Sequence, residues 1–268
     1  MRYSNLHTHT TFSDGVNTIE ENVLSAIDKN FISIGISDHS YTAFDTRYCI
    51  RPVNIPAYHR EIRRVAEKYK DQIEVYVGLE YDGYTELEDR DLYDYVIGDC
   101  HYIKVDGSYH SVDHDKDEQW DTIEKYFNGD TLAYAKKYFE TYVERQQLHK
   151  PDILGHFDIP VLYGYMEEDN PIYRNMATEA LIASLEVTPI LELNNGAIAK
   201  KRRTEPYPHT FLLKEALAHG AKVVLSSDAH KVENQCFHFD ESLQLLSSLG
   251  YKEIVIYRNH QFEEVGIV

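Results

Sequence analysis

The feature that most constrains this chain is the regular alternation of short apolar runs with longer stretches of helical periodicity. The apolar runs, each of strand length, cover residues 3–6, 32–36, 73–79, 95–97, 153–154, 189–193, 222–225 and 253–257. Helical patterns lie between them at about 18–29, 55–70, 131–149, 172–186 and 209–219. Such alternation is typical of β/α units and predicts an α/β fold built on a parallel sheet.

Polar residues of the kinds that bind metals follow these runs at close range. They are, in order of the runs, His7 and His9, Asp38 and His39, Glu80, His101, His156, Asn194 and Asn195, and Asp228 and His230. Because the carboxyl ends of parallel strands meet on one face of a β/α barrel, these side chains are predicted to converge. The other histidines are interpreted as surface or helix positions: His59, His110, His114, His149, His209, His219, His238 and His260.

Size, charge and cysteine content narrow the class of protein. A length of 268 residues suits one large α/β domain, although two small domains would also fit. The net charge of −18 disfavours a nucleic-acid partner, and it requires any phosphate site to create its own positive field, as bound metals do. The three cysteines form no CxxC pair, and no long apolar segment is present, so we expect a cytoplasmic protein with reduced thiols and no membrane partner.

The segment His7-Thr8-His9 carries the first specific signal. Residues two apart on an extended strand end point the same way, so both imidazoles can reach one metal ion. An HxH pair also occurs by chance, and an edge strand with two surface histidines is the alternative. The segment that follows, Thr10-Thr11-Phe12-Ser13-Asp14-Gly15, strengthens the metal interpretation.

Six segments together resemble the polymerase-and-histidinol-phosphatase (PHP) superfamily. They are HTHTTFSDG at 7–15, SDH at 37–39, GLE at 78–80, GDCH at 98–101, GHFD at 155–158 and SDAH at 227–230. They occur in family order over nearly the whole chain. The resemblance implies a distorted (β/α)7 TIM-like barrel that forms a single domain over residues 1–268. SDHSYTAFDTRY, the long insert after the fourth run and the NNG…EPYP segment look most like the histidinol-phosphate phosphatase branch.

The resemblance also implies two or three divalent metal ions, with Zn²⁺, Mn²⁺ and Fe²⁺ suited to imidazole and carboxylate ligands. His7, His9, Glu80 and Asp228 would surround the first ion. Glu80 would bridge to a second ion held by His101 and His156, and Asp14, His39 and His230 would hold a third. Related branches place histidine at the position of Asp14, so the third ion is the least secure. Asp38 and Asp158 are assigned to orienting imidazoles, with turn-stabilising roles as the alternative.

By the same resemblance, the chain would hydrolyse L-histidinol phosphate to L-histidinol and phosphate in histidine biosynthesis, through a metal-bridged hydroxide that attacks phosphorus. Asp14, His39 and His230 are the candidates for assisting the leaving alkoxide. Lys201, Arg202 and Arg203 are candidates for binding the phosphate of this small-molecule phosphomonoester, or else a solvated loop cluster. Asp45, Asp82 and Asp113 are candidates for the substrate amine. A nucleotide or phosphotyrosine phosphatase and a non-catalytic metal-binding module are the alternatives.

Overall fold

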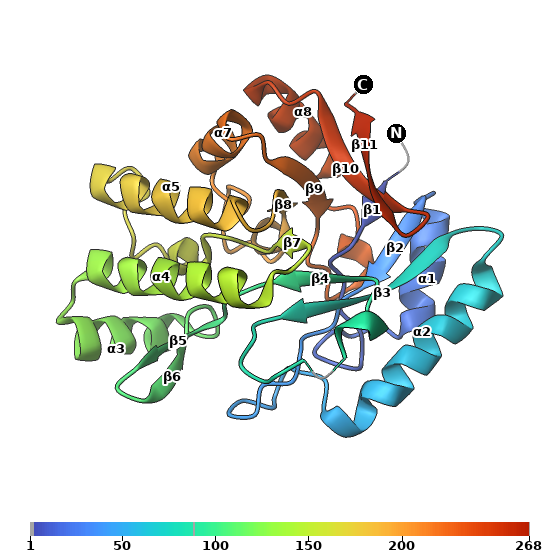
Figure 1. The fold of residues 1–268 in the computed structure, drawn as a ribbon, viewed down its shortest axis with the longest axis horizontal. Helices are drawn as coiled ribbons and strands as arrows, with labels where there is room; N and C mark the ends of the chain where they lie inside the picture. Colours follow the sequence, from blue (N-terminus) through green and yellow to red (C-terminus); the bar gives the residue numbers. More distant parts are fainter. Residues whose placement is uncertain (1–2, 88, 268) are drawn as a thin grey trace.

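A curved nine-stranded sheet surrounded by helices is the centre of the computed structural model, which describes residues 3–87 and 89–267 (Figure 1). Its strands, in spatial order, are β1 (Ser4–Asn5), β2 (Ser33–Ile36), β3 (Glu74–Tyr81), β4 (Tyr95–Gly98), β7 (Ile153–Leu154), β8 (Ile190–Asn194), β9 (Lys222–Ser226), β10 (Glu253–Arg258) and β11 (Gln261–Gly266). All neighbours from β1 to β10 pair in parallel, and β11 pairs antiparallel with β10.

The sheet closes into a ring of seven strands at the end where the polar residues gather. Just beyond β1 and β9, Thr8 and Ala229 form a parallel bridge, in which His9 N donates to Ala229 O over 2.9 Å. Near the other end of the strands the ring is wider, because β10 contributes Val255 and Tyr257 to the interior cluster. Two more strands thus extend a seven-stranded barrel, which confirms the distorted (β/α)7 fold and assigns the last apolar run to β10.

The helices lie on the outside of this barrel, with α1 and α2 on one side and α4, α5 and α7 on another (Figure 1). Their bounds are α1 (Ile19–Asp28), α2 (Ile55–Tyr69), α3 (Lys116–Phe127), α4 (Thr131–His149), α5 (Pro171–Leu185), α6 (Gly196–Ala199), α7 (Thr210–Ala218) and α8 (Phe239–Leu249). Local sequence explains several starts. Thr18 and Glu21 form a capping box at α1, and Asp115, Asp130 and Asn170 cap α3, α4 and α5 with their side chains.

Two apolar clusters hold the barrel together. The larger lies mainly between strands and helices, and the smaller fills the barrel interior with Leu6, Tyr76, Tyr95, Ile97, Ile153, Ile190, Val224, Val255 and Tyr257. Tyr95 is central to the second cluster, because its ring occupies the space that a Cβ on Gly35 or Gly78 would need. Its hydroxyl donates to Leu6 O, directly before the first histidine of the site.

The structure also contains elements that the apolar pattern does not reveal. The insert after β4 forms a hairpin of β5 (Tyr102–Val105) and β6 (Ser108–Ser111), followed by α3, and β11 extends the sheet beyond β10. The apolar pattern does not reveal the hairpin because Lys104 interrupts the apolar residues of β5 and all four residues of β6 are polar or aromatic.

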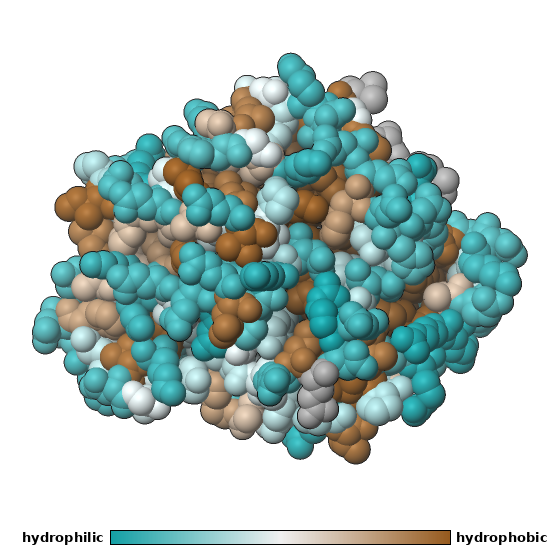
Figure 2. All heavy atoms as spheres, in the orientation of Figure 1, coloured by the Kyte–Doolittle hydropathy of each residue, from teal (hydrophilic) through white to brown (hydrophobic). Residues whose placement is uncertain are grey.

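The surface of the molecule is mainly polar on the face shown in Figure 2. Hydrophilic residues cover most of the face seen in Figure 2, and apolar residues are scattered between them. Within the described ranges, no helix combines the length and apolar character needed to cross a membrane.

Candidate metal centre

Strand alternation carries several carboxylates to the rim of the barrel interior. Tyr95 and Ile97 face the interior, and Asp99 has the same parity just beyond β4. Likewise Glu192 lies two residues after the interior residue Ile190 in β8. Side chains two apart in a strand share a face, so the pattern that packs the barrel also delivers charged groups to its open end.

Glu80, near the end of β3, is the centre of the site and is almost fully buried. Five imidazoles surround its carboxylate. Their distances to Oε1 are 3.3 Å from His7 Nε2, 3.5 Å from His101 Nε2 and 2.9 Å from His156 Nε2, and those to Oε2 are 3.5 Å from His9 Nε2 and 2.6 Å from His39 Nδ1. These residues come from five different strand ends, so the predicted convergence is present in the structure.

Asp228 completes the group on the opposite side. Its Oδ1 lies 3.1 Å from His9 Nε2 and 3.9 Å from His7 Nε2. The backbone of Asp228 has φ +45°, a conformation that aspartate tolerates better than most residues and that ends β9 abruptly. Gly196 makes room for the carboxylate, since a Cβ there would approach Asp228 Oδ2 to 2.7 Å.

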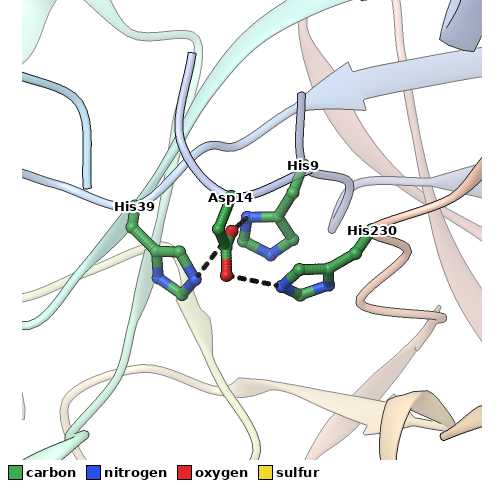
Figure 3. A group of neighbouring side chains, drawn as sticks. All are labelled: His9, Asp14, His39 and His230. Atoms are coloured by element: carbon green, nitrogen blue, oxygen red, sulfur yellow. Dashed lines mark ion pairs between the residues drawn. The ribbon is translucent and has the colours of Figure 1, made fainter. Parts of the chain in front are cut away.

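A more open cluster lies beside it, where three imidazoles face Asp14 (Figure 3). The Asp14 carboxylate is 3.2 Å from His230 Nε2, 3.6 Å from His39 Nε2 and 3.9 Å from His9 Nδ1. The Asp14 side chain is 34% exposed, whereas that of Glu80 is 1% exposed. The cluster predicted to hold the third ion therefore borders solvent, and the other two clusters are enclosed.

The donor atoms fit divalent metal ions. His9 Nδ1 and Nε2, His7 Nε2, His39 Nδ1 and Glu80 Oε2 are buried without a hydrogen-bond partner of proper geometry. Buried polar atoms are rarely left so, and here they point toward one another. The compact groups that could each hold an ion are His9–Asp14–His39–His230, His7–His9–Asp228, His39–Glu80–His101 and His7–Glu80–Asp99–His156. Imidazole with carboxylate is a donor set suited to Zn²⁺, Mn²⁺ and Fe²⁺.

Three buried carboxylates lie behind the imidazoles. Asp82 Oδ1 is 2.9 Å from His101 Nδ1, Asp99 Oδ1 is 2.8 Å from His156 Nδ1, and Glu192 Oε2 is 2.9 Å from His7 Nδ1. Each leaves the Nε2 atom of its histidine facing Glu80. Such outer contacts fix the orientation and tautomer of metal-binding histidines.

The two aspartates assigned to this orienting role from the sequence do something else. Asp38 accepts hydrogen bonds from Thr10 N and Oγ1 and from Ser13 Oγ, so it holds the turn after β1. Asp158 accepts from His209 N, at the start of α7. Their turn-stabilising alternative is therefore the one that the structure supports. Glu192 was missed because it lies inside a strand, although a carboxylate within an otherwise apolar run was a visible signal.

The negative potential of the cluster favours cations. Burial disfavours a charged imidazole at His101, but the nearby carboxylates of Asp82, Asp113 and Glu80 outweigh it and raise the pKa of His101 to about 10. His39 shows the same balance: burial opposes the charge, and Glu80 and Asp14 raise its pKa. A site that attracts protons this strongly also attracts metal ions.

A cavity of about 300 Å³ opens directly above these residues. Its wall contains Glu80, His101, His156, Asp228, His230 and Asp14, and also Tyr48, Tyr102, Asp113, His114, Lys200, Arg202 and Tyr207. His114 is exposed, as expected for a surface position, and it also borders this cavity. The cavity is large enough for a small molecule and is the space in which a substrate would meet the cluster.

The basic segment after β8 divides into two kinds of residue. Arg202 and Lys200 line the cavity, and Lys200 Nζ is 3.4 Å from Asp228 Oδ2. The Arg203 side chain is only 6% exposed, pairs with Glu168 at 2.8 Å and lies over the Tyr207 ring. Lys201 is exposed and is not part of the cavity wall. Of the three residues expected to bind phosphate, Arg202 alone reaches the cavity in the structure.

The three aspartates considered for binding a substrate amine lie in different environments. Asp113 lines the cavity. Asp82 is buried against His101, where it also accepts the backbone N–H of that residue at 2.8 Å. Asp45 pairs with Arg47 and accepts from Tyr102 at 2.8 Å. Asp113 is thus the member of this set that remains available to a ligand.

A seven-stranded barrel whose rim gathers histidines and carboxylates beside an open cavity defines the class of barrel proteins that bind divalent metal ions at the rim. The family follows from comparison with known sequences: the model of the PHP domain matches residues 5–196, and the chain belongs to this family.

Similar proteins cover nearly the whole chain. A protein of Deinococcus radiodurans named probable histidinol-phosphatase is 25% identical over 92% of this chain and 94% of its own length. The crystal structure of HisK from Listeria monocytogenes aligns with a TM-score of 0.77 at 20% identity, over 89% of this chain and 99% of that one. Histidinol phosphate phosphatase from Lactococcus lactis, solved with zinc, L-histidinol and phosphate, aligns with a TM-score of 0.75 at 20% identity, over 98% and 99%.

Proposed function

We propose that residues 1–268 form a single-domain, metal-dependent phosphomonoesterase that hydrolyses L-histidinol phosphate to L-histidinol and phosphate in histidine biosynthesis. The observation that carries the proposal is the ring of imidazoles around Glu80 at the floor of a cavity whose wall also holds Arg202 and Lys200. The family membership and the names of the relatives support the same substrate.

Two or three ions of zinc, manganese or iron fit the donor atoms. By the resemblance to the family, His7, His9, Glu80 and Asp228 would hold the first, Glu80, His101 and His156 the second, and Asp14, His39 and His230 the third. The close contacts among the members of each set support this assignment. When bound, such ions lower the pKa of water, polarise phosphoryl oxygens and stabilise the charge on leaving oxygens.

The residues of the cavity wall supply binding and proton transfer. Arg202 and Lys200 would bind the phosphoryl oxygens, since guanidinium and ammonium groups offset their negative charge. The Asp113 carboxylate would receive the cationic amine of the substrate. Asp14, His39 and His230, which lie together at the solvent-facing edge, are the residues that would assist departure of the leaving alkoxide; Asp14 Oδ2 lies 3.2 Å from His230 Nε2 there.

Steady-state kinetics on a panel of phosphomonoesters would test this function. The purified, metal-loaded protein is expected to show its highest kcat/KM with L-histidinol phosphate, compared with nucleoside monophosphates and phosphotyrosine. Arg202→Met provides the matched control, because the substrate preference should persist while KM rises. A higher kcat/KM with a nucleotide or with phosphotyrosine would refute L-histidinol phosphate as the substrate. Full turnover by the metal-free protein would refute the metal-dependent mechanism.

A further inference from the structure

Glu192 is a buried carboxylate that contacts two of the candidate ion-binding clusters and is not among the expected metal ligands. It lies in β8 and is 1% exposed. One of its oxygens contacts the side chain of His7, in the first cluster, and the other contacts the backbone of His156, in the second. Both histidines have Nε2 atoms that face Glu80.

The two oxygens of Glu192 have different partners. Oε1 accepts from His156 N at 2.6 Å and from Asn194 Nδ2 at 2.8 Å. The Asn194 amide is itself fixed, because its Oδ1 accepts from Gly196 N at 2.8 Å. Oε2 faces His7 Nδ1 at 2.9 Å. A carboxylate only accepts hydrogen bonds, so His7 Nδ1 must carry the proton and His7 Nε2 keeps its lone pair.

We propose that Glu192 is a positioning residue that sets the tautomer of His7 and couples the His7 cluster to the His156 cluster. The inference rests on the metal site proposed above, and it deepens that site by naming the group on which two of its ligands depend together. Loss of this one carboxylate should therefore weaken both enclosed ion sites, although Glu192 itself holds no place among the expected ligands.

Replacement of Glu192 by glutamine would invert this arrangement. The amide oxygen must take the Oε1 place, because two N–H donors point there. The amide NH2 group then faces His7 Nδ1, which has to accept a hydrogen bond, and the ring proton moves to Nε2. A protonated Nε2 has no lone pair for a metal ion. The substitution thus converts His7 from a ligand into a hydrogen-bond donor while side-chain volume hardly changes.

Asp82 offers a matched comparison, because the same kind of substitution leaves its pattern intact. Its Oδ1 accepts from both N and Nδ1 of His101, at 2.8 and 2.9 Å, and its Oδ2 has no hydrogen-bond partner. An asparagine at this position can keep its carbonyl oxygen on both donors, so the His101 tautomer is preserved. Like Glu192→Gln, Asp82→Asn keeps the shape of the side chain and removes one negative charge. Comparing zinc affinity in the two variants therefore separates the effect of the histidine tautomer from the effect of the lost charge.

The experiment measures zinc affinity of the whole chain by chelator competition, with zinc content determined by elemental analysis, for wild type, Glu192→Gln and Asp82→Asn. Affinity of the Gln variant should fall about 10–100-fold, the usual effect of losing such an outer contact, and the Asn variant should lose less. Equal losses in the two variants, or wild-type affinity in Glu192→Gln, would overturn the proposal. Zinc affinity and zinc content are measured without substrate. A failure of the proposed phosphatase activity can therefore be distinguished from a failure of the role proposed for Glu192.

Nitrogen-15 NMR of the zinc-loaded wild-type protein reports directly which ring nitrogen of His7 carries the proton. The imidazole signals that disappear in His7→Gln identify His7. They should show a protonated Nδ1 and a metal-bound Nε2. If His7 instead bound zinc through Nδ1, Glu192 would not have the role proposed here.

Discussion

His101→Ala tests the enclosed part of the site most directly. His101 is buried, its Nε2 atom lies 3.5 Å from Glu80 Oε1, and its Nδ1 atom is held by Asp82. Removing the ring takes away one of the two imidazoles expected at the second ion. Stabilisation of transition-state charge by a bound metal is worth several kcal/mol. If about 4 kcal/mol is lost, kcat should fall about 10³-fold, since each 1.36 kcal/mol is about tenfold.

The same substitution should cost less in folding than in catalysis. Asp82 keeps the backbone N–H of residue 101 as a hydrogen-bond donor, and the vacated ring lay on the cavity wall, so water can reach the carboxylate. We expect a loss of about 1–3 kcal/mol in the free energy of unfolding, the range for an unsatisfied buried group. Urea titration followed by circular dichroism measures this loss, and stopped assays with L-histidinol phosphate measure kcat.

His59→Ala is the matched control. His59 is also a buried histidine, but it lies in α2, and its ring meets the Tyr93 ring edge-on. Its replacement should lower stability by a similar amount and leave zinc content and kcat close to wild type. Turnover by His101→Ala at the wild-type rate, or equal loss of kcat in both variants, would refute the assignment of the second ion.

Three further outcomes are expected. Dialysis against a chelator should abolish phosphatase activity, and addition of Zn²⁺ or Mn²⁺ should restore it. Calorimetry should show a lower Tm for the metal-free protein than for the metal-loaded protein, by about 5–10 °C for each site when the free metal concentration is about 100 times the Kd of that site. Gly78→Ala should lower the free energy of unfolding by about 1–3 kcal/mol, because the new Cβ would approach Tyr95 Cζ to 2.3 Å in the packed interior; an unchanged urea midpoint would contradict this packing. Arg202→Met should raise KM for the phosphomonoester with stability unchanged, whereas Arg203→Met should lower stability because it removes the Arg203–Glu168 ion pair; the reverse pattern would show that Arg203, and not Arg202, binds the phosphate.

The sequence predicts the barrel and the convergence of the site because both follow from one rule. Parallel strands bring their carboxyl ends to one edge, so His7, Glu80 and His156 can be assigned to a common rim without coordinates. The apolar runs locate β1 to β4 and β7 to β10 because those strands are largely buried on both faces. The β5–β6 hairpin lacks such a run, because it lies at the edge of the site and carries polar residues.

The outer contacts could not be assigned in this way. Asp38 and Asp82 both lie beside ligand residues in sequence or space, yet only Asp82 meets an imidazole. The difference arises because the two carboxylates point in different directions at the ends of their strands. Local backbone dihedral angles set these directions. Likewise, Arg202 and Arg203 are neighbours in the chain, but Arg202 lines the cavity and Arg203 lies over the ring of Tyr207.

The bridge between Thr8 and Ala229 has a consequence for biosynthesis of the molecule. The ring cannot close, and Asp228 and His230 cannot join the histidines after β1, until more than two hundred residues have been made. On the ribosome the N-terminal part emerges first, so the segment His7–His9 is exposed in an incomplete ring until β9 has been synthesised. The metal ions can bind with full affinity only after β9 and the residues that follow it have been added. Nascent chains that stop before β9 should therefore not retain zinc.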